Sequence, residues 1–217
     1  MSRPVKRPYD ASRRHAQARE TQRAILRAAH DLFVEQGYGR TTITQIAERA
    51  RVSPETIYAT FKNKVTLLHR TWDVTIGGDD TEVVFHERPE VMAIRGEPDL
   101  AKRLMMHARF STATARRMTP FVRSVRGAAG SEVSAAEMAT EMERQRLNGM
   151  TVMAQEAAAT GQLKVTEQEC RDLIWAMTDG HLWHQLVAER GWSDDQYADW
   201  LGRMWVALLV KDDAPHR

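Results

Sequence analysis

The sequence predicts an all-α fold. Apolar residues recur three and four positions apart in several long segments, which is the spacing of one side of a helix. Glycines stand between these segments, where a helix can end. Neither an alternating run typical of a strand nor an internal repeat stands out along the 217 residues. We therefore expect helices throughout the chain.

Composition favours a globular protein without a membrane span. Hydrophobic residues make up 42% and charged residues 28% of the chain, so it can build a core and stay soluble. The apolar runs are all shorter than the roughly 18 residues of a spanning helix. The charged N-terminus argues against a secretory signal, and the single cysteine, Cys170, fits a reducing compartment. We expect a cytoplasmic protein with no membrane partner.

Charge is divided unevenly along the chain. Residues 1–70 hold 14 Lys and Arg against 6 Asp and Glu, a net charge of +8. Residues 71–217 hold 17 against 23, a net charge of −6. A basic first part beside an acidic remainder indicates that one part binds a polyanion, although an ordinary solvated charge run would look the same by itself.

The first 40 residues predict an arm and a helix. Residues 1–18 are predicted to be a flexible basic arm, because apolar residues are scarce and Pro4 and Pro8 interrupt it. Residues 20–36 have helical spacing, and Gly37 follows them as a stop signal. A short second helix is then predicted after Thr41 and Thr42, two candidate N-caps.

The stretch SPETIYATFKNK, from Ser53 to Lys64, predicts a short helix with a thin apolar side. Ser53 is a good N-cap, and Pro54 suits the first helical position. Ile57 and Phe61, four positions apart, point inward together. The remaining surface of this helix is polar.

Two short helices, a tight turn and a supporting helix make a helix-turn-helix. A helix that enters the major groove must be thin, polar outside and held by apolar residues on one side only. Hydroxyls and lysines around it can contact phosphates. We therefore predict a helix-turn-helix DNA-binding domain at residues 19–66.

Residues 41–68, TTITQIAERARVSPETIYATFKNKVTLL, resemble the DNA-binding domain of the tetracycline-repressor (TetR) family of transcriptional regulators. Residues 24–42 resemble that family's first helix and its glycine-rich exit. The order apolar helix, Gly-x-Gly, Thr-Thr, Ile-Ala, Val-Ser, Ile-Tyr, Phe, Lys carries the resemblance. The rest of the chain is similar only in being helical, of suitable length, and ending in two long helices.

The resemblance implies a role for each matching residue. Thr42, with Thr41 beside it, would bind a phosphate, and Tyr58 would do so through its hydroxyl. Lys62 and Lys64 would hold the DNA backbone. The residues nearest the base edges would be Ser53, Pro54, Glu55, Thr56 and Ala59. Thr42 and Ser53 would also act as helix caps.

The turn between the two short helices departs from the family pattern. Many members have glycine where this chain has Arg51, and glycine usually marks a backbone conformation that other residues disfavour. Either the turn accepts a side chain here or it is slightly strained. Arg51 is a further candidate for a phosphate contact. The basic arm is longer than the motif needs, and we expect it to add salt-dependent affinity that is independent of sequence.

Residues 67–217 would, by the same resemblance, form a helical effector-binding and dimerisation domain. A loop is predicted at 77–90, and helices at 98–126 with a break near Thr119–Pro120, 131–160, 167–190 and 194–210. The last two helices carry more apolar residues than one face of each needs for an internal core. They are the expected dimer surface, through Leu173, Ile174, Met177, Leu182, Leu186, Val187, Trp200, Leu201, Met204, Trp205, Leu208 and Leu209.

The middle helices would form a pocket for a small, largely apolar effector, again by resemblance. Methionine and aromatic side chains make adaptable apolar walls, although for any single one of these residues plain core packing is favoured. The candidate lining residues are Met106, His107, Phe110, Phe121, Met142 and Trp175. No cofactor is expected.

Other classes of protein find little support in the sequence. His181 and His184, with Asp179 nearby, are three apart with no matching cluster elsewhere, so packing or a dimer contact is favoured over a metal. Catalytic motifs are lacking, so we expect no enzyme. The leading function is a homodimeric, ligand-responsive repressor that binds a palindromic operator. The alternative is an architectural or global DNA-binding protein without an effector. The effector, the operator, the regulated genes and the choice between repression and activation are not in the sequence.

Overall fold

The computed structural model describes residues 11–77 and 88–212, and the prediction of an all-α fold is confirmed. Within these residues the only β-type pairing is an isolated antiparallel bridge between Leu163 and Val210. The helices are α1 (Ala11–Gln36), α2 (Ile43–Ala50), α3 (Pro54–Phe61), α4 (Lys64–Gly77), α5 (Pro89–Gly96), α6 (Leu100–Ala128), α7 (Val133–Ala158), α8 (Glu167–Met177), α9 (His181–Trp183), the π-helix η2 (His184–Glu189) and α10 (Asp194–Leu209).

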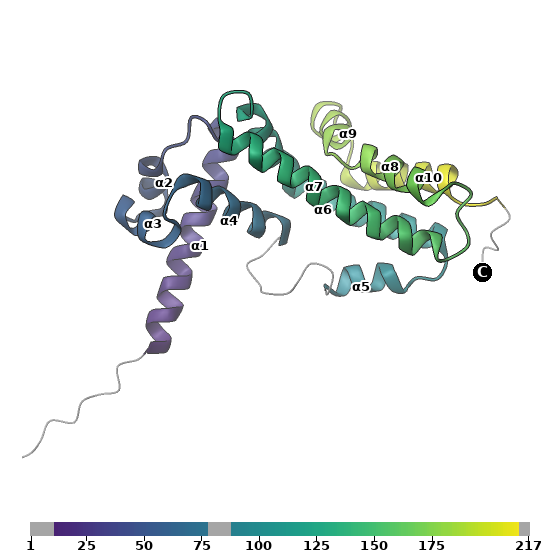
Figure 1. Cartoon of the computed structure of the whole chain (residues 1–217), viewed down its shortest axis with the longest axis horizontal. Coiled ribbons are helices and arrows are strands. Elements are labelled where there is room, and N and C mark those ends of the chain that lie inside the picture. The colour runs from purple at the N-terminus through teal and green to yellow at the C-terminus, as the bar shows by residue number, and fades with distance from the viewer. Residues whose placement is uncertain (1–10, 78–87, 213–217) are drawn as a thin grey trace, which may run out of the picture.

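The helices form an elongated molecule with the short N-terminal helices at one end (Figure 1). The long helices α6 and α7 run from that end into the body, where α8 to α10 cover them (Figure 1). The most extensive helix contacts in the body are those of α10 with α6 and of α8 with α7. Because α6 also packs against α1 and α4, it touches both ends of the molecule.

Two hydrophobic cores hold the fold together. The first unites α1 to α4 with the C-terminal half of α6 and the N-terminal half of α7, and includes Phe33, Trp72 and Phe121. The second fills the body between α6, α7, α8 and α10, around Trp205. The predicted domain boundary between residues 66 and 67 falls inside the first core, because Leu67 of α4 is fully buried there.

The N-terminal arm is partly helical, contrary to prediction. Residues 11–18 form the first turns of α1, and residues 1–10 lie outside the described part of the chain. Alanine, arginine and glutamine, which dominate this segment, favour helices, and the packed remainder of α1 supplies the nucleus from which the helix extends.

The predicted break at Pro120 is also wrong, because α6 continues through it. A proline inside a helix costs about 3 kcal/mol. Phe121 and Val125 directly after it are fully buried, and this packing offsets the cost. Most of the predicted loop at 77–90 lies outside the described residues. The helix α5, which begins at Pro89 with proline in the first turn, was not predicted.

The predicted single helix at 167–190 is instead three elements. α8 ends at Met177, and Gly180 adopts φ +85° before α9 and η2. The Asp179 carboxylate accepts a hydrogen bond from the N–H of His181 (2.8 Å), which helps to start the next segment. A β-carbon on Gly180 would lie 2.4 Å from Thr119 Oγ1 of α6, so only glycine fits this turn.

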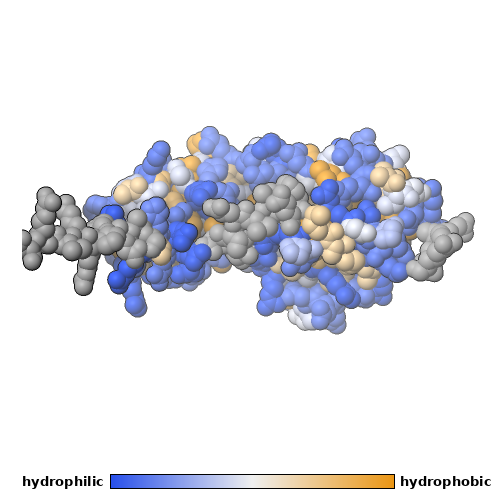
Figure 2. Space-filling model, turned by 90° about the horizontal axis from the view of Figure 1, so that it is seen from below, coloured by the Kyte–Doolittle hydropathy of each residue, from blue (hydrophilic) through white to orange (hydrophobic). Residues whose placement is uncertain are grey.

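The surface seen in Figure 2 is mostly hydrophilic, with apolar side chains in scattered groups. In the described part of the chain, every helix is too short or too polar to cross a bilayer.

Gly180 allows a direct test of this packing. We expect Gly180→Ala to lower the free energy of unfolding by about 2–4 kcal/mol, because a left-handed backbone and a steric clash act together. Gly191 is the matched control, since its φ is +76° but nothing lies within 4 Å of an added β-carbon. Gly191→Ala should cost only about 1 kcal/mol. Chemical denaturation measures both, and equal costs would contradict the predicted role of Thr119.

Candidate nucleic-acid interface

Thr42 directly precedes α2, and its side chain caps the helix. Thr42 Oγ1 accepts a hydrogen bond from the N–H of Gln45 (3.2 Å), and Gln45 Oε1 accepts one from the N–H of Thr42 (2.8 Å). This reciprocal pair is a capping box. Thr42 stays exposed at a helix N-terminus, where free N–H groups and the helix dipole favour an anion.

Thr41 is used inside the protein, so its predicted phosphate contact is wrong. The residue is 1% exposed. Its hydroxyl lies 3.1 Å from the carbonyl oxygen of Leu32 and 2.9 Å from that of Gly37, and fastens the exit of α1. The sequence could not separate two adjacent threonines, since only the direction of the backbone decides which one turns inward.

The turn between α2 and α3 has a left-handed residue at Arg51, with φ 57° and ψ 44°. Both readings left open by the sequence apply, because the turn accepts a side chain and holds it in a left-handed conformation that glycine would adopt with less strain. The N–H of Val52 donates to the carbonyl of Ala47 (3.0 Å) and closes the turn. Arg51 itself is exposed beside the start of α3.

α3 has the geometry that the sequence predicts. Ser53 Oγ accepts a hydrogen bond from the N–H of Thr56 (3.3 Å), and Pro54 occupies the first turn. Ile57 and Phe61 are 1% and 2% exposed and fix the helix from behind. The side chains of Glu55, Tyr58, Ala59, Thr60 and Lys62 are exposed, with Pro54 and Thr56 partly so. One wide polar side of α3 is therefore accessible.

Lys62, at the end of α3, also has a positive φ, as Arg51 does. Its φ is 64° and its ψ is −49°, and the N–H of Asn63 donates to the carbonyl of Phe61 (2.7 Å). This is a γ-turn of the rare, strained hand. It directs the chain into α4, where Asn63 Oδ1 accepts a hydrogen bond from the N–H of Thr66 (2.8 Å).

Lys64 is half-buried and contacts the protein, and its predicted role on DNA stays a prediction. Its ammonium donates to the carbonyl of Tyr38 (2.7 Å) and lies 4.1 Å from the centre of the Tyr38 ring. Burial lowers the pKa of Lys64, while nearby Glu132 raises it. Lys64 thus ties the start of α4 to the exit of α1.

Charges around α3 are mixed. Hydrogen bonds from the backbone N–H of Glu55 and from Ser53 lower the pKa of the Glu55 carboxyl, so it is ionised at the start of α3. The Arg49 guanidinium donates two hydrogen bonds to the Glu35 carboxylate (3.1 and 2.8 Å). This ion pair is exposed and therefore weakly stabilising. The sequence analysis missed Arg40, an exposed cation just before Thr42. Its place in the glycine-rich exit of α1 was the available signal.

The six predicted pocket residues do not surround one cavity. Phe121 and Met142 are buried in the first core, and Trp175 is 36% exposed with the Arg146 guanidinium over its ring. The ring centroid of His107 lies 6.0 Å from that of Phe110 and 5.9 Å from that of Trp205, which belongs to the second core. Met106 lies elsewhere, in a groove of about 580 Å³ between α6 and α10. The residues lining this groove are Glu97, Ala101, Lys102, Met105, Met106, Arg109, Arg203, Val206 and Ala207.

The two C-terminal histidines serve local contacts. His184 Nε2 lies 3.2 Å from the Glu189 carboxylate, and the backbone of His181 binds Asp179. Among the described residues, His, Cys, Asp and Glu side chains form no group of three that could hold a metal ion.

Comparison with known proteins matches the part of the chain that carries this interface. Residues 25–71 match the family model described as bacterial regulatory proteins, tetR family. The HTH-type transcriptional regulator YdeS of Bacillus subtilis (strain 168) is 48% identical over 48 residues, which are 22% of this chain and 24% of that protein. The chain therefore matches only about a quarter of the length of this curated relative.

Solved structures share the fold over nearly the whole chain. A protein described as a TetR-family transcriptional regulator from Rhodococcus sp. has a TM-score of 0.67 and 17% identity, covering 88% of this chain and 99% of its own. A transcriptional regulator from Saccharomonospora viridis in complex with choline has a TM-score of 0.66 and 17% identity, covering 89% and 99%. Residues 25–71 thus match the DNA-binding domain of the tetR family, and the likeness to these solved structures shows that the rest of the chain has the same fold. Proteins of this family are transcription factors and not enzymes.

Arg51 allows the strain in the turn to be measured. A left-handed residue other than glycine costs about 1–2 kcal/mol, and the greater chain entropy of glycine offsets part of the gain. We expect Arg51→Gly to raise the free energy of unfolding by about 0.5–1 kcal/mol. Arg51→Ala, which removes the same side chain and keeps the strain, should not. A gain in both variants would show that the side chain, and not the backbone, is unfavourable.

His107 should make stability depend on pH. Burial lowers the pKa of His107 from 6.5 to about 4. As the pH falls below 6.5, the unfolded chain binds a proton that the folded protein does not, so stability is full above pH 6.5 and is lost towards pH 4. This loss should be about 2–3 kcal/mol. It should be absent in His107→Leu and retained when the exposed His15 is changed to Gln. Parallel pH profiles of the wild type and His107→Leu in urea titrations would refute it.

Proposed function

We propose that this protein is a transcriptional repressor that binds a palindromic DNA operator as a homodimer and is released by a small effector. One observation carries the proposal: α3 presents an exposed polar side and is held from behind only by Ile57 and Phe61. A helix of this kind fits the major groove. The family match covers this helix completely.

Roles on DNA follow from chemistry and exposure. The ionised carboxylate of Glu55 suits the amino group of a cytosine, and it would be repelled by phosphates. Ser53, Pro54, Thr56 and Ala59 share its side of the helix and lie near the base edges. The contacts to phosphate come from Thr42, Tyr58, Lys62, Arg51 and Arg40, all of which are exposed.

A dimer is part of the proposal because one helix-turn-helix reads few base pairs. Of the twelve apolar residues expected at the dimer surface, Ile174, Leu201, Trp205 and Leu209 are buried within the chain. The other eight remain partly exposed, on α8 to α10. These eight suit pairing with a second copy of the chain.

The effector would act through α6. Near its start α6 lines the groove with Met105 and Met106, and beyond Pro120 it packs into the first core through Phe121. Pro120 lacks the N–H that would bond the carbonyl of Arg116, so α6 can bend between the two contacts. An apolar molecule in the groove or in the second core would tilt α6 and with it α1 and α4. The spacing of the two α3 helices in the dimer would then no longer match the operator.

This coupling is reciprocal, so operator DNA must weaken effector binding by the same factor. The architectural alternative lacks any such coupling and predicts similar affinity for all duplexes. The acidic second part of the chain speaks against it, because a non-specific binder gains from basic charge throughout.

Selection of bound sites from a random duplex pool tests the proposal. We expect two inverted half-sites about one helical turn, or a multiple of it, apart.

Glu55→Gln should relax the preference at one position of each half-site by about 10- to 100-fold, which corresponds to about 1–3 kcal/mol. Tyr58→Phe should weaken all sequences alike. Glu137→Gln, an exposed acid on α7, is the control and should change neither. Equal affinity for selected and random duplexes would reject the repressor and favour the architectural alternative.

A further inference from the structure

The first turns of α1 project from the protein and are not packed against its hydrophobic core. α1 continues well past α3 and α4, away from α6 to α10 (Figure 1). Residues 13–20 are all exposed, whereas Ile25, Ala29 and Phe33 further along are fully buried. At 1.5 Å per residue, the part of α1 before Ile25 is about 20 Å long. A helix of this length is marginal alone and persists here as an extension of the packed half.

This segment offers no surface for an apolar partner. Residues 11–24 contain no Leu, Ile, Val, Met, Phe or Trp. It therefore has neither the apolar face of a helix that docks on another protein nor that of a helix that lies in a bilayer. Its possible partners are those that bind through charge.

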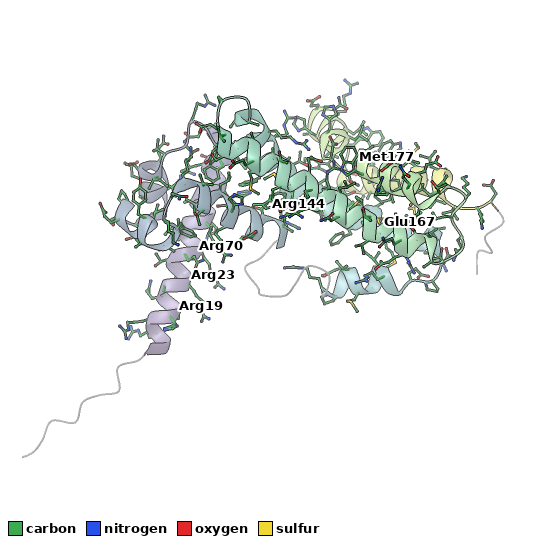
Figure 3. All side chains as sticks on the ribbon, in the orientation of Figure 1. Arg19, Arg23, Arg70, Arg144, Glu167 and Met177 are labelled. Atoms are coloured by element: carbon green, nitrogen blue, oxygen red, sulfur yellow. The ribbon has the colours of Figure 1, made fainter. Side chains whose placement is uncertain are left out.

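The charge of the segment is strongly positive. Arg13, Arg14, Arg19 and Arg23 oppose the single acid Glu20. Arg19 and Arg23 are one turn apart and extend from the projecting part of α1 (Figure 3). The first turn of α1 contains no acidic residue, so its cations lie at the positive end of the helix dipole. That placement is unfavourable for the isolated protein and favourable once an anion binds there.

The direction of the segment is fixed by the helical repeat. Arg14, Ala18 and Gln22 follow one another every four residues and lead into Ile25 and Ala29 of the core stripe. The side of α1 that carries them is thus the side that, one turn further on, packs against the domain. Arg14, His15, Ala18, Arg19 and Gln22 border a shallow hollow of about 500 Å³. This side of the projecting helix therefore faces the space beside the DNA-binding domain.

We propose that residues 13–23 form a rigid basic helix that binds the DNA phosphates flanking each half-site. The inference rests on the proposed function, which brings duplex DNA to the neighbouring domain. Because the segment is already helical, it loses little conformational entropy on binding, in contrast to a flexible arm. The helix contacts the DNA backbone, so it lengthens the bound site without adding base pairs that are recognised by sequence.

The test measures operator affinity of the full-length protein against salt concentration. Arg14→Gln with Arg19→Gln should reduce the slope of log affinity against log salt by about 2 per protomer, near 0.9 for each lost phosphate contact. The bases selected within the half-sites should not change. Arg95→Gln with Arg144→Gln removes the same charge from exposed positions of α5 and α7 and is the control, with the wild-type slope expected.

A second variant separates a rigid helix from a flexible basic arm. Ala16→Gly with Ala18→Gly keeps every charge and disfavours the projecting helix by about 1 kcal/mol per residue. We expect 3- to 10-fold weaker operator binding, with lower helicity by circular dichroism and an unchanged thermal midpoint for the core. Unchanged affinity with lower helicity would overturn the rigid helix.

The possible failures are distinguishable. A wild type that binds no duplex rejects the proposed function. A wild type that binds its operator with the same salt slope as Arg14→Gln with Arg19→Gln rejects the inference alone. Loss of binding to anionic phosphatidylserine vesicles in that variant, with an unchanged slope on DNA, would reassign the segment to a membrane surface.

Discussion

The contact of Phe121 with the N-terminal helices joins the two ends of the molecule. Phe121 is fully buried and stacks on His30 and Trp72, with ring centroids 5.8 and 6.0 Å away. Phe33 meets the same ring edge-on at 6.1 Å. Loss of a buried phenylalanine typically costs 3–5 kcal/mol, of which these ring contacts supply a part. This cluster is one of the contacts that hold α1 and α4 against α6, so a movement of α6 can reach α3 through it.

The aromatic cluster holds α6 against the N-terminal helices, and hydrogen bonds fix the orientation of these helices relative to α6. Arg117 of α6 donates to the carbonyls of Thr75 (2.9 Å) and Ile76 (3.1 Å), which are among the last of α4. Ser124, two turns further, accepts a hydrogen bond from the N–H of Tyr38 (3.0 Å) and donates to the carbonyl of Phe33. α6 is thus bonded to α4 and to the exit of α1. A change in the tilt of α6 must move both, since a packed core transmits displacement rather than absorbing it.

Short-range features of this fold were predictable from the sequence, because they depend on neighbouring residues. The N-caps Thr42 and Ser53, the proline that starts α3 and the pair Ile57 and Phe61 all act within a few positions. The open question at Arg51 was likewise a local one, about a single backbone angle.

Features that depend on residues far apart in sequence could not be predicted. Phe121 is of the residue type expected in a ligand pocket. It lies in the first core instead, because Phe33 and Trp72 pack against it. Lys64 has the charge of a DNA contact, but a carbonyl 26 residues earlier lies within its reach. The break at Gly180 is required by Thr119 on another helix. In each case the residue type alone did not decide the role, because the role depends on a partner that the fold supplies.

Both ends of α3 adjoin a strained backbone. Arg51, two residues before its N-cap, and Lys62 at its end are the two non-glycine residues with positive φ in the described chain. Each costs about 1–3 kcal/mol, and such conformations persist where the surrounding structure demands them. Between them α3 contributes only Ile57 and Phe61 to the core, so its position is determined as much by the two turns as by burial. A recognition helix held in this way can be thin and polar, since the turns replace the apolar face that a longer helix would need. Both strained positions also carry cations, so binding a phosphate at either one would stabilise the conformation that places α3 for reading.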